Sequence, residues 1–307
     1  MDFFEELRRE ADRLGFDRFG VVGAEAPPDY GRYLDWVARG FAAELRYMVE
    51  ETRAKKRGDL SLVLPGVRSV IVGGFSYAPN SPPPPTDAKW ARYGWGRDYH
   101  EVVKEKLDAL VAWMRANAPE PFEARTYVDT GPILERSLAE RAGIGWIGKN
   151  TCVIDRDLGS YLYLGEVLTT LALPLSAQAR NHCGTCTKCI DACPTQAIEA
   201  PYRLNAQKCI SYQTLENRTQ DIPPSIAERL EGWVAGCDIC QEVCPWNRDA
   251  PPTRHPDFEP RQHAFVTRDE IARMDAAQFA EKFGGTSFER TGLLKLQRTV
   301  RQGTKIP

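Results

Sequence analysis

The feature that most constrains this chain is a group of eight cysteines between residues 183 and 244, out of nine in its 307 residues. They fall into two runs, and each run ends at a proline. Val234 stands where a cysteine would complete the second run, and Cys209, between the runs, is the obvious substitute. The first run is Cys183, Cys186, Cys189 and Cys193 before Pro194, and the second is Cys237, Cys240 and Cys244 before Pro245.

This spacing predicts two [4Fe–4S] clusters. C-x2-C-x2-C-x3-C-P is the pattern of bacterial two-cluster ferredoxins, in which the last cysteine of each run ligates the other cluster. The proline ends each ligand segment because it has no N–H and cannot continue a helix. One predicted cluster takes Cys183, Cys186, Cys189 and Cys244, and the other takes Cys193, Cys209, Cys237 and Cys240.

Other uses of clustered cysteines fit the spacing less well. Zinc ribbons use C-x2-C pairs, but they need neither a third evenly spaced cysteine nor C-x3-C-P. Clustered C-x2-C thiols in a long chain without an export signal favour a metal site over disulfides. A radical enzyme that uses S-adenosylmethionine would need C-x3-C-x2-C, and Gln196 and Asn247 stand where its third cysteine would fall.

Composition limits the remaining possibilities. The apolar and charged fractions, 42% and 27%, are those of an ordinary globular protein, and the length suits two domains or one elaborated domain. No apolar run approaches the ~18 residues of a membrane span. The acidic start of the chain lacks the order of an export signal, so we expect a cytoplasmic protein. A net charge of −2 gives no global case for nucleic-acid binding, which would need a local patch.

Helices and strands alternate before the cysteine region, which predicts an α/β or α+β fold. We expect an N-terminal catalytic domain over 1–175, a ferredoxin-like domain over 176–250 and a short helical segment over 251–307. A capping box at Thr267–Glu270 opens a helix in that last segment, and Gly284-Gly285 ends it. The earlier helices are expected over 3–14, 30–51, 98–117 and 133–142, and the strands over 19–22, 69–72, 122–128 and 161–171.

Few residues outside the cysteine runs suggest chemistry. Asp129 follows a predicted strand and precedes a helix that begins near Pro132, a place for catalytic carboxylates and also for ordinary helix caps. The glycine-rich loop over 143–150 has no nucleotide-binding spacing, and Cys152 after it is interpreted as a buried core thiol.

Two basic stretches, 55–57 and 290–305, are interpreted by default as solvated surface. The second, which contains no acid, is the best local candidate for contacting phosphate.

Longer segments across the chain resemble the epoxyqueuosine reductases, iron–sulfur enzymes that depend on cobalamin and are similar in fold to reductive dehalogenases. The block over 236–247, joined to the block around Asp129, carries the resemblance most specifically. There are three departures: Gln213-Thr214-Leu215-Glu216 stands where many members carry Leu-Thr-Ile-Glu, Cys152 stands where an aliphatic residue is usual, and we expect no C-terminal helical-repeat module. The matching segments are 64–71, 96–100, 127–136, 143–151, 159–166, 183–194, 208–212 and 236–247.

The resemblance implies the last step of queuosine synthesis in tRNA. Two clusters, fed by a low-potential donor of the ferredoxin or flavodoxin type, would reduce base-off cobalamin, and cob(I)alamin would act on the epoxide of the modified base in the anticodon loop. Asp129 matches the proposed proton donor, with a pKa that burial raises. His100 is expected outside the site. Arg57, Lys149, Asn150 and Ser211 are the candidate contacts to the corrin, together with Asp129.

Two other functions stay open on the sequence. A corrinoid and iron–sulfur reductase of another substrate, such as an organohalide, would explain the cysteines and the N-terminal domain equally well. A plain electron-transfer protein would explain the cysteines but would leave Asp129 and more than half of the chain without a role.

Overall fold

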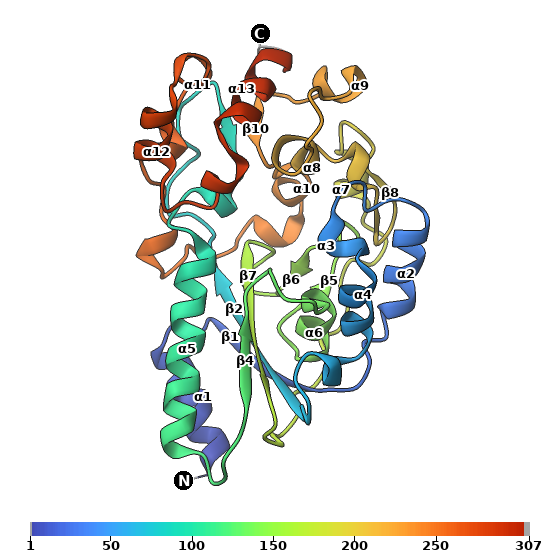
Figure 1. Cartoon of the computed structure of the whole chain (residues 1–307), viewed down its shortest axis with the longest axis vertical. Coiled ribbons are helices and arrows are strands. Elements are labelled where there is room, and N and C mark those ends of the chain that lie inside the picture. The colour runs from blue at the N-terminus through green and yellow to red at the C-terminus, as the bar shows by residue number, and fades with distance from the viewer. Residues whose placement is uncertain (1, 304–307) are drawn as a thin grey trace.

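The computed structural model describes residues 2–303, and its centre is a four-stranded sheet of order β1-β2-β7-β4 (Figure 1). All three pairings are antiparallel, so the N-terminal region is α+β and the α/β alternative is wrong. The two central strands pair over their whole length, from Ser69 opposite Thr169 to Ser76 opposite Leu162. The strands are β1 (Arg18–Gly23), β2 (Ser69–Ser76), β4 (Ala124–Tyr127) and β7 (Leu162–Thr169).

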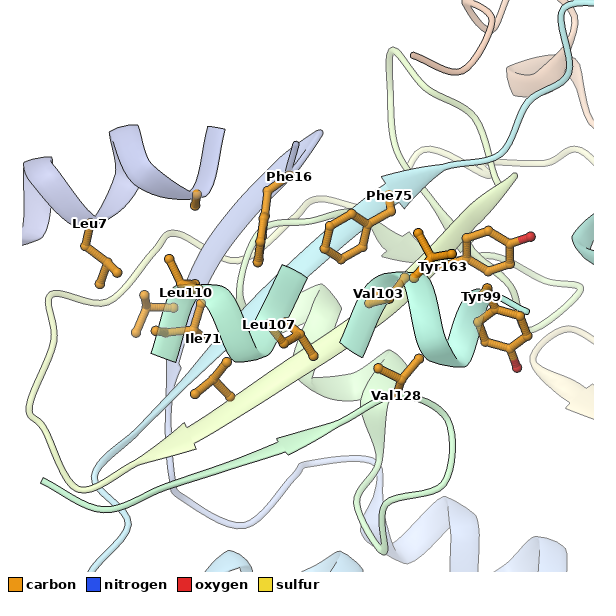
Figure 2. Close-up of a cluster of buried hydrophobic side chains, with 14 of the residues drawn as sticks. Leu7, Phe16, Ile71, Phe75, Tyr99, Val103, Leu107, Leu110, Val128 and Tyr163 are labelled. Carbon is orange, nitrogen blue, oxygen red and sulfur yellow. The ribbon is translucent and has the colours of Figure 1, made fainter. Parts of the chain in front are cut away.

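Two helices, α1 (Phe3–Arg13) and α5 (Tyr99–Asn117), cover one face of the sheet (Figure 1). Figure 2 shows Leu107 and Leu110 of α5 pointing at the strands, where they join a buried apolar cluster. Gly165 in β7 permits this approach, because a Cβ there would lie 2.7 Å from the Val103 side chain. The sheet therefore fixes the position of α5, whose first residues are Tyr99 and His100.

The opposite face carries α6 (Glu135–Arg141) and a second apolar cluster that includes Val72, Leu138 and Leu168. The segment expected as one helix over 30–51 holds two helices, because Gly40 takes a left-handed φ of +70° and ends the first of them, and a third helix begins at Glu51. They lie beside α6 in Figure 1. They are α2 (Tyr30–Ala38), α3 (Arg46–Val49) and α4 (Glu51–Gly58).

Short elements make up the cysteine region, as expected where ligand loops replace a large core. Its strand β10 pairs in parallel with β3 (Lys89–Trp90), so the cysteine region is joined to the N-terminal region by a sheet contact. The elements are α7 (Lys188–Asp191), β8 (Ile198–Ala200), β9 (Arg203–Leu204), α8 (Ile210–Leu215), α9 (Pro224–Ala227), β10 (Trp233–Ala235) and α10 (Ile239–Glu242).

The C-terminal segment forms three helices, α11 (Arg268–Arg273), α12 (Ala276–Phe283) and α13 (Leu293–Gln302). The capping box at Thr267 is confirmed, but a second one at Asp275 starts α12, so the single expected helix is two. None of the helices in residues 2–303 is long and apolar enough to cross a membrane. Turns of 3-10 helix cover Leu60–Leu62, Arg92–Gly94, Ala206–Lys208, Pro245–Asn247, Pro256–Phe258, Gln262–Phe265 and Glu289–Thr291.

Candidate functional site

Four cysteines from the two distant runs line one cavity, together with Lys149 and Trp246. They are the four that the crossed pattern assigns to one cluster. The Lys149 ammonium donates to the carbonyls of Gly184, at 2.7 Å, and Cys186, at 2.9 Å, and so holds the ligand loop in place. Thiolates converging from separate segments fit a polynuclear cluster. The four are Cys183, Cys186, Cys189 and Cys244.

The other four predicted ligands also lie together. Burial raises the pKa of the Cys237 thiol, and the neighbouring Cys209 and Cys193 sulfurs raise it further. Cys240 lies within the same electrostatic reach of Cys209 and Cys237. Val234, which interrupts the second run, is fully buried in the core beside β3, so its place is not at the ligand set. The structure thus brings Cys209 near Cys193, Cys237 and Cys240, and its role as a ligand stays a prediction.

Cys152 lies at this second ligand set rather than in an apolar core, which differs from the sequence interpretation. Its thiol and that of Cys240 are hydrogen-bonded, which lowers the pKa of Cys152 and raises that of Cys240. Asn150 ties the two segments together: its Nδ2 donates to the Cys240 carbonyl at 3.3 Å, and its Oδ1 accepts from the Cys152 N–H at 3.2 Å. The loop that carries them joins β5 (Trp146–Ile147) to β6 (Val153–Ile154).

A second constellation surrounds Asp129, at the end of β4. Asp129 adopts a φ of +59°, a left-handed conformation that is uncommon outside glycine and that clusters at functional sites. Its Oδ2 accepts a hydrogen bond from the Tyr99 hydroxyl at 3.0 Å. Tyr99 is held by stacking on Tyr163, with ring centroids 4.5 Å apart, at one end of the cluster in Figure 2.

His100 completes this constellation, contrary to the expectation that it lies outside the site. Its Nε2 lies 3.5 Å from Asp129 Oδ2, an ion-pair separation, and its Nδ1 lies 2.6 Å from Asp98 Oδ1. Burial alone would lower the pKa of His100, but the carboxylates of Asp129 and Asp98 outweigh it and raise the pKa to about 9. The imidazole is therefore a protonated cation at neutral pH.

The charge of Asp129 follows from the same contacts. Burial acts to raise the pKa of Asp129, but His100, Tyr99 and the Arg290 charge together hold it below its ordinary value. The predicted raised pKa is therefore wrong for this structure, because the sequence did not show a cation beside the carboxylate. In the resting site the proton resides on His100, and Asp129 is its anionic partner.

A cleft of about 280 Å³ opens next to Asp129. It is close to the lower end of the range for small-molecule sites. Asp98 and His100 line it from the start of α5, and Lys104 and Arg290 place cations on its wall. The remaining lining residues are Thr126, Tyr127, Val128, Thr130 and Ser287.

Arg57, on α4, is buried rather than part of a solvated basic patch, with 2% of its surface exposed. Its Nε and Nη1 have no hydrogen-bond partner in residues 2–303, and its Nη2 meets the Met48 sulfur at 3.4 Å. The guanidinium also lies 5.6 Å over the Tyr33 ring. A buried cation with unpaired donors is costly, so these donors fit a ligand that brings oxygen acceptors.

The other predicted corrin contacts are placed less favourably. Lys149 and Asn150 are both engaged with the cluster loops, which accounts for their side chains without a corrin. Ser211 directs its backbone N–H at the Cys209 sulfur and is half-buried. Its side-chain role stays a prediction.

The basic C-terminal stretch is not a phosphate-binding surface as a whole. Lys295 donates to the Leu215 carbonyl at 2.7 Å, and the buried Arg298 donates to the carbonyls of Gln213 and Asn217. Both therefore anchor α13 to α8. Lys305 lies outside the described residues. Arg290 is the member of this stretch that lines the cleft.

Sequence reasoning missed Tyr99 and two glutamates with buried carboxyl oxygens, Glu135 and Glu166. Glu166 is fully buried in β7, among apolar neighbours. A charged residue inside an otherwise apolar buried strand was the available indication, since such residues are almost never fully buried unless they are paired.

Comparisons with known proteins agree with this arrangement. A family model described as "4Fe-4S double cluster binding domain" matches residues 182–247, and one described as "Epoxyqueuosine reductase QueG, DUF1730" matches residues 57–130. The chain is 44% identical to an epoxyqueuosine reductase of Synechocystis sp., over 88% of this chain and 93% of that one. It is 41% identical to one of Gloeobacter violaceus, over 96% and 94% of the two chains.

Solved structures give the same result. A crystal structure of epoxyqueuosine reductase with an epoxyqueuosine-modified tRNA stem loop is similar at a TM-score of 0.88 and 32% identity, over 97% of this chain and 80% of that one. A Bacillus subtilis epoxyqueuosine reductase, described with its catalytic aspartate loop swung out of the active site, matches with the same score and coverage.

Proposed function

The chain belongs to the epoxyqueuosine reductase family, and we propose that it reduces epoxyqueuosine in tRNA to queuosine with electrons that pass through two [4Fe–4S] clusters to a bound cobalamin. The observation that carries this proposal is the combination, in one fold, of the two cysteine groups with the Asp129 cleft. The reaction breaks both C–O bonds of an epoxide and consumes two electrons and two protons, giving an alkene and water. The protein must therefore deliver electrons and protons to the same place.

We propose that electrons enter at the cluster held by Cys183, Cys186, Cys189 and Cys244. The loop around the first three of these is largely exposed, so a ferredoxin or flavodoxin in the cytoplasm can approach it. The second ligand set lies against Asn150 and Cys152 of the catalytic domain. We therefore propose that electrons pass from the first cluster to the second before they reach the cobalamin site.

The residue that best fits a contact to cobalamin is Arg57, whose guanidinium has two buried N–H donors without a partner in residues 2–303. We propose that Arg57 donates to a carboxamide or phosphate oxygen of cobalamin within the catalytic domain, residues 1–175. When bound, cobalamin supplies low-potential electrons to the epoxide carbon.

Asp129 and His100 supply protons to the departing oxygen. As negative charge develops on that oxygen, a proton transferred from His100 Nε2 to Asp129 Oδ2 can pass on to it, and a pKa of about 9 keeps His100 loaded at neutral pH. The Tyr99 hydroxyl holds Oδ2 in place at 3.0 Å. That the loop of the B. subtilis relative can swing out supports a mobile Asp129 loop here.

We further propose that the modified base of tRNA enters the cleft beside Asp129, as the solved complex of a relative with a tRNA stem loop suggests. Lys104 and Arg290 on the wall would contact phosphate or ribose oxygens of the anticodon loop. A base displaced from its stack is the usual way for an enzyme to reach one nucleotide.

The proposal is tested by turnover of epoxyqueuosine-containing tRNA under anaerobic conditions. Protein reconstituted with both clusters is given a low-potential reductant, with and without cobalamin, and the nucleosides are analysed by mass. Loss of one oxygen that depends on cobalamin supports the proposal. No conversion by protein shown to hold iron and cobalt would contradict the proposed substrate.

A further inference from the structure

Two glutamates lie beneath the Asp129 loop with buried oxygens that have no partner. Both carboxyl oxygens of Glu166 are fully buried, and neither has a hydrogen-bond partner in residues 2–303. The buried Oε1 of Glu135, the first residue of α6, is unpaired in the same way. Glu166 pairs across the sheet with Tyr127, two residues before Asp129. Neither glutamate has a part in the chemistry described above.

The two carboxyl groups face each other and cannot both be charged at neutral pH. Burial raises the pKa of Glu135 to about 8, and the Asp129 charge adds to this. Burial also raises the pKa of Glu166 well above its ordinary value, and Glu135 raises it further. Two carboxylates in one dry site must retain a proton, as in other carboxyl pairs. An O–H of one glutamate that donates to the other satisfies the oxygens that otherwise have no partner.

This pair adjoins the backbone that carries Asp129. The Asp129 N–H faces the Glu135 carboxyl and stabilises its charged form. On the other side of the loop, Arg53 donates to the Thr130 carbonyl at 2.8 Å. The strained φ of +59° at Asp129 therefore lies between two anchors.

We propose that the Glu135–Glu166 pair is a proton-sharing latch that holds the Asp129 loop in its catalytic position. This rests on the proposed function only in that Asp129 acts in catalysis. While the pair retains its proton, it carries one negative charge rather than two, and it accepts the Asp129 N–H with less repulsion of the carboxylate of the same residue. When it loses that proton, the two negative charges of the pair adjoin the charge of Asp129, and the loop is released.

The charged groups that face the pair are Asp129, from the loop after β4, and Arg136, from α6. Arg136 also donates to the Thr151 carbonyl at 3.1 Å, so its charge is shared with the glycine-rich loop. It favours the ionised form of Glu135 and so limits the stability of the protonated pair. The two glutamates and Asp129 make the site acidic overall, which favours retention of the proton.

The test measures the proton and the loop separately, on the full chain with both clusters. Infrared spectroscopy is expected to show a protonated carboxyl band at pH 7 that Glu166→Gln removes. Hydrogen exchange over residues 127–134, corrected for the chemical rate, is expected to rise by up to about tenfold for each pH unit as pH approaches the pKa of the latched pair, and to level off above it. The double variant Glu135→Gln/Glu166→Gln, which cannot ionise, should show no such rise.

Glu140→Gln is the matched control, since Glu140 also lies on α6 but accepts the Ile147 N–H at 2.9 Å. It should keep both the band and the pH response of the loop. Absence of the band in the wild type, or an equal pH response in the double variant, would overturn the latch. Neither measurement uses tRNA or cobalamin, so a failure of the proposed substrate leaves both results readable.

Discussion

The Nε2 of His100 lies 3.5 Å from the Oδ2 of Asp129, and the cationic imidazole keeps the carboxylate ionised. The pair comes from two elements of different kinds, the first turn of α5 and the loop after β4. Packing of α5 on the sheet brings them together. The acid of this site is therefore a two-residue unit with a proton stored on the imidazole.

The pH dependence of turnover tests this unit. The pKa of His100 is about 9 in the folded chain, above the ordinary 6.5, so its protonated form persists at neutral pH and is lost as pH rises through about 9. The ion pair stabilises the folded chain fully below about pH 6.5, and this contribution is lost as pH rises through about 9. We expect kcat to fall above about pH 9, and His100→Gln to lower kcat about 100-fold at neutral pH and to remove this alkaline limb. An unchanged pH profile in His100→Gln would exclude the imidazole as the proton store.

Cys209 provides a test of the ligand assignment. Cys209→Ser should remove one cluster and about half of the iron, because the second set would keep only three thiolates. Cys152→Ser is the matched control, since its thiol contacts Cys240 but belongs to neither predicted set. Iron analysis and electron paramagnetic resonance of the reduced proteins measure both outcomes. Full iron in Cys209→Ser, or loss of a cluster in Cys152→Ser, would reverse the two assignments.

Arg57 provides a test of the cobalamin site. Removing a buried cation that lacks a carboxylate partner should not lower the melting temperature of the cobalamin-free protein. The same change, Arg57→Met, should weaken cobalamin binding about tenfold or more, because a charged hydrogen bond is lost. Lys55→Met, two residues away on the same helix and exposed, is the control for charge and should bind normally. Equal cobalamin affinity in the two variants, measured by equilibrium dialysis, would place the corrin elsewhere.

Local patterns in the sequence predicted much of this fold. Cysteine spacing predicted which cysteines lie near one another, because a ligand loop is a local structure whose geometry depends on residue intervals. The ends of α1 and α11 were also predictable, since Gly15 and the Thr267 capping box act within one helical turn.

Contacts between distant segments were not predictable in the same way. The burial of Arg57 depends on α3 and α4 folding against each other, and the Asp129–His100 pair depends on how α5 crosses the sheet. The predicted direction of the pKa shift of Asp129 was wrong for this reason: a cation from another element, His100, lowers the pKa. The Glu135–Glu166 pair likewise arises only when α6 lies on β7, so neither residue was singled out beforehand.

A single-turnover comparison of the wild type with Asp129→Asn tests the central claim most directly. Both proteins would be loaded with clusters and cobalamin, reduced, and mixed with epoxyqueuosine-containing tRNA at pH 7, with Asp157→Asn as an exposed-carboxylate control. We predict that Asp129→Asn keeps its iron, cobalamin and tRNA affinity but forms queuosine about 100-fold to 10,000-fold more slowly. Wild-type rates in Asp129→Asn would contradict the account and remove this carboxylate from the reaction.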